Sequence, residues 1–417
     1  MEKSKLGFRG YFSIILFGLF GQLAWVIENM YFNVFLYDTI SGDTSAIAWM
    51  VAASAAVATL TTMFMGALSD KVGKRKVFIT AGYILWGLST LSFGFISVDN
   101  VRLLIPGASA ITVAVILVIV MDCVMTFFGS TANDGAFNAW VTDTTDADNR
   151  GKVEGILATL PLIALLIIFG AFDGLTKNGQ WPLFFYIIGG LVTLGGIAGI
   201  FLIKEKNVKP SEGNYWKTFF YGFRPKTIKE NAGLYLALTT MCVFSIAYQV
   251  FMPYFIVYFN EYLKIDYIII LASVLLGASI VTMIVARFTN AKTIKKFFIP
   301  SLALMIIGLL GLFFLNKAEY ALWIGIAGFV MMSGNLIFSS VVSAKIRNLT
   351  PADKVGHFQG IRMIFYVLIP MIIGPAIGSA VIKGSGMTYI NQYNQVSDVP
   401  TPVIFLTAAI AALVVLV

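Results

Sequence analysis

The chain has 417 residues, of which 58% are hydrophobic and 12% are charged, and its mean hydropathy is +0.86. Soluble domains are about a quarter charged, so this composition excludes an ordinary soluble protein and indicates a polytopic membrane protein. The net charge of +8 comes from 29 Lys and Arg against 21 Asp and Glu. Its distribution along the chain follows membrane topology and does not indicate a nucleic-acid partner.

Twelve apolar segments are long enough to cross a bilayer, which takes about 17–25 residues. They are 10–38, 45–68, 77–98, 108–140, 151–172, 181–203, 231–260, 266–288, 296–316, 320–345, 357–382 and 400–417. Each is expected to be a helix, because lipid offers no hydrogen-bond partner to an open backbone. The last segment reaches Val417 without a polar flank, so the twelfth helix is expected to be truncated.

The basic residues are distributed unequally between the two predicted sides of the membrane. Most lie on the side of the N-terminus. The other side holds Arg102, Lys177, Lys264, Lys317 and Lys383. The positive-inside rule therefore predicts that both termini are cytoplasmic, as an even number of spans requires. We expect the protein to lie in the plasma (cytoplasmic) membrane.

An internal repeat divides the chain into two halves. The segment "TDADNRGKVEGI", which starts at Thr145, matches "TPADKVGHFQGI", which starts at Thr350, at six of twelve positions. We expect a six-helix bundle over 1–203, a cytoplasmic central loop over 204–230 and a second six-helix bundle over 231–417. Repeated halves are typical of secondary transporters, which bind substrate at the interface of the repeats near the bilayer midplane.

A motif lies between the second and third segments, in "GALSDKVGKRKVFI". It resembles the signature loop of the major facilitator superfamily, whose matching positions include Gly66, Asp70, Gly73 and Arg75. The resemblance implies the major facilitator fold, with twelve helices in two bundles, and a gating role for this loop. Small Gly66 allows helices to approach closely, and Asp70 can exchange hydrogen-bond partners between conformations.

Two stretches show a closer resemblance. "FGQLAWVIENMYFNVFLYDTISG" and "DGAFNAWVTDTTDADNR" resemble the first and fourth helices of the sugar:cation symporters, which include melibiose permease and, more distantly, sucrose transporters. This resemblance implies a sugar- and cation-site acid at Asp134. This chain departs from the family at two places. The position of the family's sugar-binding Asp on the first helix falls near Leu23, and the family's sodium-site acids of the second helix have no counterpart, because Ser45 to Leu68 contains no Asp or Glu. Coupling to protons is therefore favoured, with sodium as the alternative.

Polar residues within the predicted spans of the first half are candidates for substrate binding and coupling, because they are costly in lipid. On the first helix, Trp25, Asn29 and Asn33 share one face, and Glu28 lies beside it, where desolvation disfavours a charged carboxylate. Glu28 can alternatively form a structural hydrogen bond. The fourth helix carries Asp122, Asp134 and Asn138. Asp122 is either a proton site or a buried acid tied to a neighbour, and Asp134 either serves transport or only caps its helix or pairs locally near the cytoplasmic end.

The second half contributes uncharged polar candidates. They are Tyr248, Gln249, Asn335 and Tyr366, which suit a sugar because its hydroxyl groups need hydrogen bonds and its apolar face stacks on rings. Contacts between helices are the alternative for each. Arg362, at the start of the eleventh segment, either reaches the cytoplasmic surface or pairs with a carboxylate across the gate.

No spacing typical of a metal site, a catalytic nucleophile or a phosphate-binding loop is present, so we expect neither an enzyme nor a cofactor or metal. We predict a monomeric, all-α secondary active transporter that moves a sugar, a glycoside or disaccharide, into the cell with a proton by alternating access. The alternatives are a proton-driven exporter of drugs or metabolites on the same fold and a transporter-like sensor or scaffold.

Overall fold

The protein is almost entirely helical. The computed structural model describes residues 7–106, 109–145, 149–204, 220–288, 294–351, 355–391 and 395–416. Among these, eleven helices are long and apolar enough to cross a membrane, and Val403–Leu416 is a shorter apolar helix. The eleven helices are Phe8–Thr39, Thr44–Val72, Arg75–Phe95, Ala110–Thr144, Lys152–Lys177, Trp181–Leu202, Ala232–Leu263, Ile268–Ala286, Lys296–Phe314, Ala318–Leu349 and Gly360–Ser385. These helices confirm the predicted all-α membrane fold.

The chain divides into two compact units. Unit 1 contains Met1–Ile40 and Ala56–Asn214, and unit 2 contains Ser41–Ala55 and Tyr215–Val417. The first turns of the second spanning helix therefore belong to unit 2, and the rest of that helix belongs to unit 1. Residues 205–219 of the predicted central loop, and 146–148 and 352–354 of the predicted repeat, lie outside the described residues.

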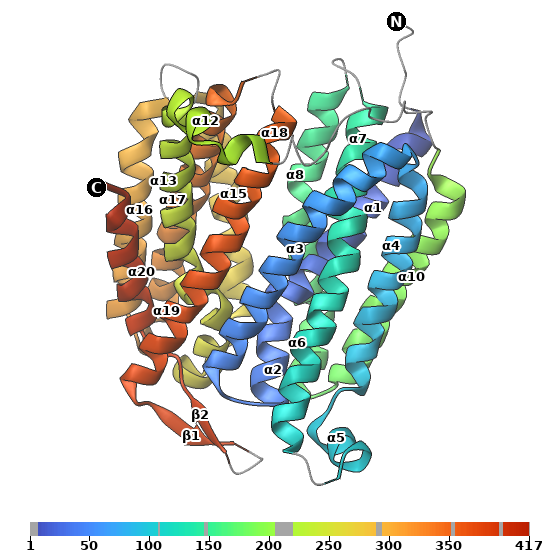
Figure 1. Ribbon diagram of the computed structural model, residues 1–417. Helices are drawn as coiled ribbons and strands as arrows, with labels where there is room; N and C mark the ends of the chain where they lie inside the picture. Colours follow the sequence, from blue (N-terminus) through green and yellow to red (C-terminus); the bar gives the residue numbers. More distant parts are fainter. Residues whose placement is uncertain are drawn as a thin grey trace, which may run out of the picture. The chain divides into compact units, whose positions relative to one another are not determined.

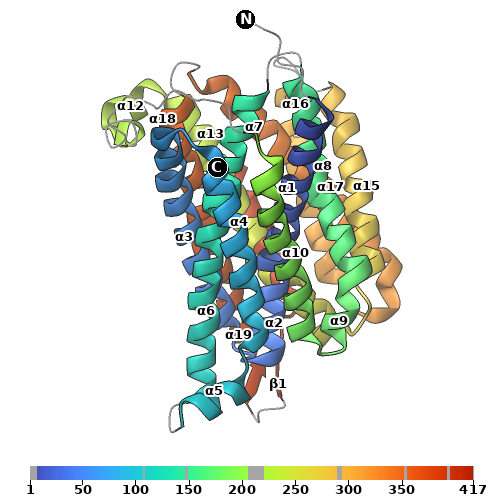
Figure 2. The same cartoon turned by 90° about the vertical axis from the view of Figure 1, so that its right-hand side faces the viewer.

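Unit 1 holds the first six spans. Its elements, several of which run on into one another, are α1 (Phe8–Val26), η1 (Ile27–Tyr31), α2 (Phe32–Thr39), α3 (Thr44–Val72, shared with unit 2), α4 (Arg75–Ser92), η2 (Phe93–Phe95), α5 (Val98–Leu104), α6 (Ala110–Gly129), η3 (Ser130–Phe137), α7 (Asn138–Thr144), α8 (Arg150–Ile167), η4 (Ile168–Phe172), α9 (Asp173–Lys177) and α10 (Trp181–Leu202). Within this unit α4 packs against α10 and α6, and α1 packs against α8 and α10. Figures 1 and 2 show α5 at the end of the unit opposite to α7.

Unit 2 holds the remaining spans and a small hairpin. Its elements are η5 (Phe220–Phe223), α12 (Pro225–Glu230), α13 (Ala232–Phe251), η6 (Met252–Tyr254), α14 (Phe255–Val257), η7 (Tyr258–Leu263), α15 (Ile268–Phe288), α16 (Ile294–Phe314), η8 (Ala318–Tyr320), α17 (Ala321–Leu349), α18 (Val355–Met363), η10 (Ile364–Leu368), α19 (Ile369–Ser385), β1 (Thr388–Ile390), β2 (Val396–Asp398), α20 (Val403–Leu413) and η11 (Val414–Leu416). The strands pair antiparallel, with Thr388 opposite Asp398. Figure 1 shows this hairpin at the end of the unit opposite to α12 and α18.

Local backbone geometry explains two features of the spans. The turn between α3 and α4 passes through Gly73, whose φ of 68° is in the left-handed region that favours glycine. Several spans also widen into π-helical turns, and two of these, η1 and η3, lie in the first and fourth spans. Such turns are concentrated at functional sites, and η1 and η3 contain Glu28 and Asp134.

Candidate functional site

Two buried acids of unit 1, Glu28 and Asp122, lie in the first and fourth spans, which contact each other beside them. Glu28 is 9% exposed and Asp122 is 2% exposed. The hydroxyl of Thr126 donates a hydrogen bond of 2.7 Å to Oε1 of Glu28. Thr126 follows Asp122 by four residues and so lies on the same face of α6. Both acids are within electrostatic range of the Cys123 thiol. The structure thus places Glu28 against the face of α6 that carries Asp122, and Thr126 is a partner that the sequence did not indicate.

A second polar network joins three helices through the side chain of Asn133. The indole of Trp25 donates to Oδ1 of Asn133 at 3.3 Å, and Nδ2 of Asn133 donates to the Tyr83 hydroxyl at 2.7 Å. The Tyr83 hydroxyl in turn donates to the carbonyl of Phe17 at 2.6 Å. The network therefore gives the oxygen and the nitrogen of the buried Asn133 amide one partner each, and it fixes the ring of Trp25.

Gly21 makes this network possible. A Cβ atom at Gly21 would overlap Nδ2 of Asn133 and lie 2.8 Å from the Tyr83 hydroxyl. Only a residue without a side chain leaves room for the amide at this crossing of α1 and η3. The sequence placed Trp25 among the candidates but gave no signal for Tyr83, which is far from it along the chain.

Asp134 lies in the π-helical segment η3 and is partly exposed. Its carboxylate faces the hydroxyls of Ser130 and Thr62, of which Thr62 comes from α3. Asn138 is exposed and donates to the carbonyl of Asp134 at 3.3 Å. Asp134 thus interacts with its own span and with α3, and Asn138 is accessible at the start of α7.

The predicted polar face of the first helix is only partly accessible. Asn29 is exposed, and its amide donates to the carbonyl of Trp25 at 2.8 Å. Asn33 is 1% exposed and donates to the carbonyl of Asn29 at 3.0 Å. Because η1 is a π-helical turn that widens the helix between these residues, the spacing of an ideal α-helix does not predict which of their side chains share an accessible face. Asn29 is accessible in this structure, whereas Asn33 is buried.

The motif between the second and third spans forms an ionic cluster around the buried guanidinium of Arg75. The guanidinium pairs with Asp70 on one side and with Asp143, at 3.1 Å, on the other, and donates to the Ser69 hydroxyl at 2.6 Å. The Arg75 side chain is 7% exposed. Asp143 belongs to α7, so the cluster ties the loop to the end of the fourth span. The sequence indicated Asp70 and Arg75 but not Asp143.

Close helix packing accompanies this cluster. A Cβ atom at Gly135 would lie 3.2 Å from the backbone nitrogen of Gly66. The motif glycine Gly66 therefore lies where α3 and η3 approach each other within backbone contact, as its small size suggested.

Three candidates of unit 2, Tyr248, Gln249 and Asn335, lie on packed helices. Tyr248 packs its ring against Phe251 at 5.4 Å, and Gln249 is partly buried. Asn335 is 8% exposed, and its amide donates to the Met332 sulfur at 3.7 Å. Such contacts are typical of packed helices. The predicted role of each residue in substrate binding stays a prediction.

The other two candidates of unit 2 contact each other. The guanidinium of Arg362 lies 5.0 Å from the centroid of the Tyr366 ring, and the Tyr366 hydroxyl is 3.2 Å from the Ser343 hydroxyl. Arg362 also lines a pocket of about 320 Å³ with Arg347 and Thr350. Tyr366 therefore orients Arg362 at the wall of this pocket.

Unit 1 also contains an acid that the sequence reasoning missed. Asp173 is fully buried, accepts a hydrogen bond of 2.7 Å from the Tyr31 hydroxyl and pairs with Lys177 at 3.2 Å. The signal that could have found it is the i, i+4 spacing of Asp173 and Lys177 at the end of an apolar span.

Within the described residues, no group of three or more His, Cys, Asp or Glu side chains is arranged to hold a metal ion.

Comparison with known proteins agrees with this architecture. The model of the Major Facilitator Superfamily matches residues 11–375. A comparison with curated proteins finds no significant match. Among solved structures, a mutant of the nucleoside transporter NupG has a TM-score of 0.73 at 12% identity and covers 98% of both chains. A bacterial homolog of the human lysosomal transporter Spinster has a TM-score of 0.66 at 13% identity and covers 98% of this chain and 96% of its own.

A peptide transporter, POT, in complex with sulfate has a TM-score of 0.69 at 14% identity and covers 99% of this chain and 95% of its own. At these identities the likeness establishes the fold alone. The family points to a membrane transporter of small molecules and not to an enzyme. The match over nearly the whole chain and the shared fold show that this protein belongs to the Major Facilitator Superfamily.

Proposed function

We propose that this secondary transporter carries a sugar, a glycoside or a disaccharide, into the cell together with a proton, by alternating access. The observation that supports this most strongly is the contact between Glu28 and Thr126 beside Asp122, inside unit 1. Acids within a membrane span are costly and by default indicate function. Two of them on facing helices form a candidate site for a coupling proton.

The partner of Glu28 suits proton exchange. A hydroxyl group can donate to a carboxylate and can accept from a protonated carboxyl group. Thr126 can therefore serve Glu28 in both protonation states by rotating one O–H bond, without moving a helix. An amine or guanidinium in its place would stabilise only the charged form. This pairing leaves the acid able to bind and release a proton during each cycle.

Accessible polar groups in the first and fourth spans support a hydroxyl-rich substrate. Asn29 directly follows Glu28 and is exposed, as is Asn138, whose amide lies against the backbone of Asp134. An accessible amide within a membrane span can donate to and accept from sugar hydroxyls. Trp25 is held in place by Asn133 and offers a ring on which an apolar sugar face can stack. Tyr248, Gln249, Asn335 and Tyr366 are proposed as the contribution of the second half.

Protons are favoured over sodium by the composition of the second span. Ser45 to Leu68 contains no Asp or Glu, and a sodium site takes several oxygen ligands at once. The carrier is proposed to act as a monomer in the cytoplasmic membrane, with both termini in the cytoplasm, as the distribution of Lys and Arg predicts.

The test is uptake into liposomes that contain the purified protein and carry an imposed proton gradient. Labelled glycosides and disaccharides form the panel, with nucleosides, dipeptides and typical drug substrates for comparison. We expect one or more sugars to accumulate against a gradient and to be released by a protonophore. Accumulation driven by sodium alone, or proton-driven export of diverse compounds, would contradict the proposal.

Two variants then locate the coupling site. Glu28→Gln and Asp122→Asn are each expected to reduce proton-driven accumulation while preserving exchange of labelled for unlabelled sugar, because exchange requires no net proton movement. Asp99→Asn is the matched control, since Asp99 is 74% exposed outside the spans. Full proton-driven accumulation by both variants would remove this pair from the coupling role.

A further inference from the structure

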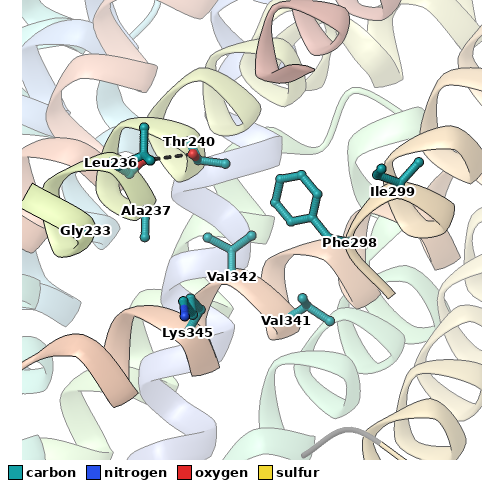
Figure 3. A pocket seen from close by; sticks show the side chains of 9 residues that line it. All are labelled: Gly233, Leu236, Ala237, Thr240, Phe298, Ile299, Val341, Val342 and Lys345. Atoms are coloured by element: carbon teal, nitrogen blue, oxygen red, sulfur yellow. Dashed lines mark hydrogen bonds between the residues drawn. The ribbon is translucent and has the colours of Figure 1, made fainter. Parts of the chain in front are cut away.

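A groove of about 330 Å³ lies on unit 2, at the end where α13 and α16 begin and α17 ends. It is lined by Gly233, Leu236, Ala237, Thr240, Phe298, Ile299, Val341, Val342 and Lys345. Figure 3 shows these side chains around the space between the three helices. A volume of this size is in the range that binds small ligands.

The walls of the groove are apolar and open to the membrane. Leu236 is 70% exposed and Ile299 is 63% exposed, and exposed apolar side chains on spanning helices face hydrocarbon. The Thr240 hydroxyl is used within its own helix, where it donates to the carbonyl of Leu236 at 2.8 Å (Figure 3). A Cβ atom at Gly233 would meet no atom within 4 Å, so this glycine leaves the groove open. A flexible apolar chain could therefore lie along the body of the groove without displacing a polar group from a hydrogen bond.

One charge stands at the edge of the groove. Lys345 is exposed and is the charged residue among those that line it. The sequences of α13, α16 and α17 contain no Asp or Glu, so none of the three helices can neutralise it. Lys296, also exposed, lies at the same end of α16, two residues before Phe298. The groove is thus apolar along its walls and positively charged at the end that is predicted to be cytoplasmic.

We propose that this groove binds an anionic phospholipid of the cytoplasmic leaflet, with an acyl chain along the apolar walls and its phosphate on Lys345. Basic pockets between spanning helices on the cytoplasmic side are suited to acidic headgroups. A zwitterionic lipid would fit the same apolar walls but would gain less from the ammonium group of Lys345, which none of these three helices neutralises. The proposal does not depend on the identity of the transported solute.

The test is competition between two lipids for the purified full-length protein. The protein is placed in nanodiscs that contain equal amounts of phosphatidylglycerol and phosphatidylcholine, and the lipids retained after transfer to detergent are counted by native mass spectrometry. We expect retention of phosphatidylglycerol over phosphatidylcholine by about fivefold, the factor that one lysine near a membrane surface contributes. Lys345→Gln should abolish the preference and Lys345→Arg should keep it.

Two further variants separate the groove from general effects. Gly233→Leu fills the apolar body and should lower retention of both lipids, without change in the monodispersity of the protein. Lys204→Gln removes an exposed lysine of unit 1 on the same predicted side and should leave the preference intact. Equal retention of the two lipids by the wild type, or an unchanged preference in Lys345→Gln, would show that only the general lipid annulus covers this face and would overturn the proposal.

Discussion

The carboxylate of Asp43 lies 2.8 Å from the ammonium group of Lys383, so the residues just before α3 are tied to the end of α19 within unit 2. Lys383 also donates to the Ser45 hydroxyl at 2.9 Å. Next to this pair, the Thr44 hydroxyl donates to Asp398 at 3.0 Å, and the backbone nitrogen of Asp398 donates to the carbonyl of Gly42 at 2.9 Å. These bonds explain why Ser41–Ala55 belongs to unit 2.

The pair between Asp43 and Lys383 predicts a pH dependence. Burial raises the pKa of Asp43. The hydrogen bonds from Lys383 and Ser45, together with the charge of Lys383, lower the pKa by more than burial raises it, so it lies below its ordinary value of 3.8. A lowered folded-state pKa means that the stabilisation is complete above the ordinary value and is lost as pH falls through the folded-state value. Both side chains are nearly half exposed, so solvent screening limits the contribution to about 0.5–1 kcal/mol.

Asp43→Asn should therefore lower thermal stability slightly at neutral pH, and the difference from wild type should shrink as the pH falls below 3.8, the ordinary pKa of the carboxyl group, and through its lowered folded-state pKa. Thermal unfolding in detergent across this pH range measures it, with added salt expected to shrink the difference. Asp99→Asn, which removes a more exposed pair with Arg102, is the control. A difference that grows on acidification would contradict the sign of this argument.

Thr126→Val is predicted to weaken coupling while the protein stays folded. The substitution keeps the shape of the side chain but removes the hydroxyl that bonds Glu28. Hydrogen bonds to charged groups contribute about 1.5–3 kcal/mol, so we expect proton-driven accumulation to fall by about tenfold or more. Thr159→Val is the matched control, because Thr159 is exposed and bonds only its own helix. Equal losses in the two variants would show that the effect is not specific to Glu28.

Gly21→Ala is predicted to destabilise unit 1. Its methyl group would overlap the amide of Asn133, and overpacking of a filled core costs about 1–3 kcal/mol. Gly190→Ala adds the same methyl group to α10 where no atom lies within 4 Å, and should be neutral or slightly stabilising because alanine favours helix. Thermal unfolding of both variants checks the difference, and a Gly21→Ala protein as stable as wild type would mean that the network shifts without cost.

Arg75→Lys is predicted to impair transport although it conserves charge. A guanidinium reaches Asp70, Asp143 and Ser69 from one planar group, whereas an ammonium group is a point charge that cannot reproduce this geometry. We expect a loss of about tenfold in initial uptake rate, equivalent to about 1.4 kcal/mol. Lys74→Gln, at an exposed neighbouring position, should retain the wild-type rate. If Arg75→Lys keeps the wild-type uptake rate, the cluster needs only a positive charge at this position and not the geometry of a guanidinium group.

The candidate site could be predicted from the sequence only in part. Glu28, Asp122 and Asp134 were recognisable because an acid in an apolar segment is conspicuous without knowledge of its partners. Asn33 was grouped with Asn29 by ideal helical spacing, and the π-helical turn η1 changes the spacing. Tyr83 and Asp173 were missed because their partners, Asn133 and Tyr31, lie on other helices.

The sequence by itself determined the spanning helices, because lipid leaves an apolar segment no alternative to internal hydrogen bonding. It also determined the turn at Gly73, where the backbone adopts a conformation that favours glycine. Only the tertiary structure decided that Thr126 faces Glu28, that Asp143 completes the cluster of Arg75, and that Asp43 meets Lys383. These pairs depend on how separate helices cross, and packing between helices leaves no periodic signal in either segment alone.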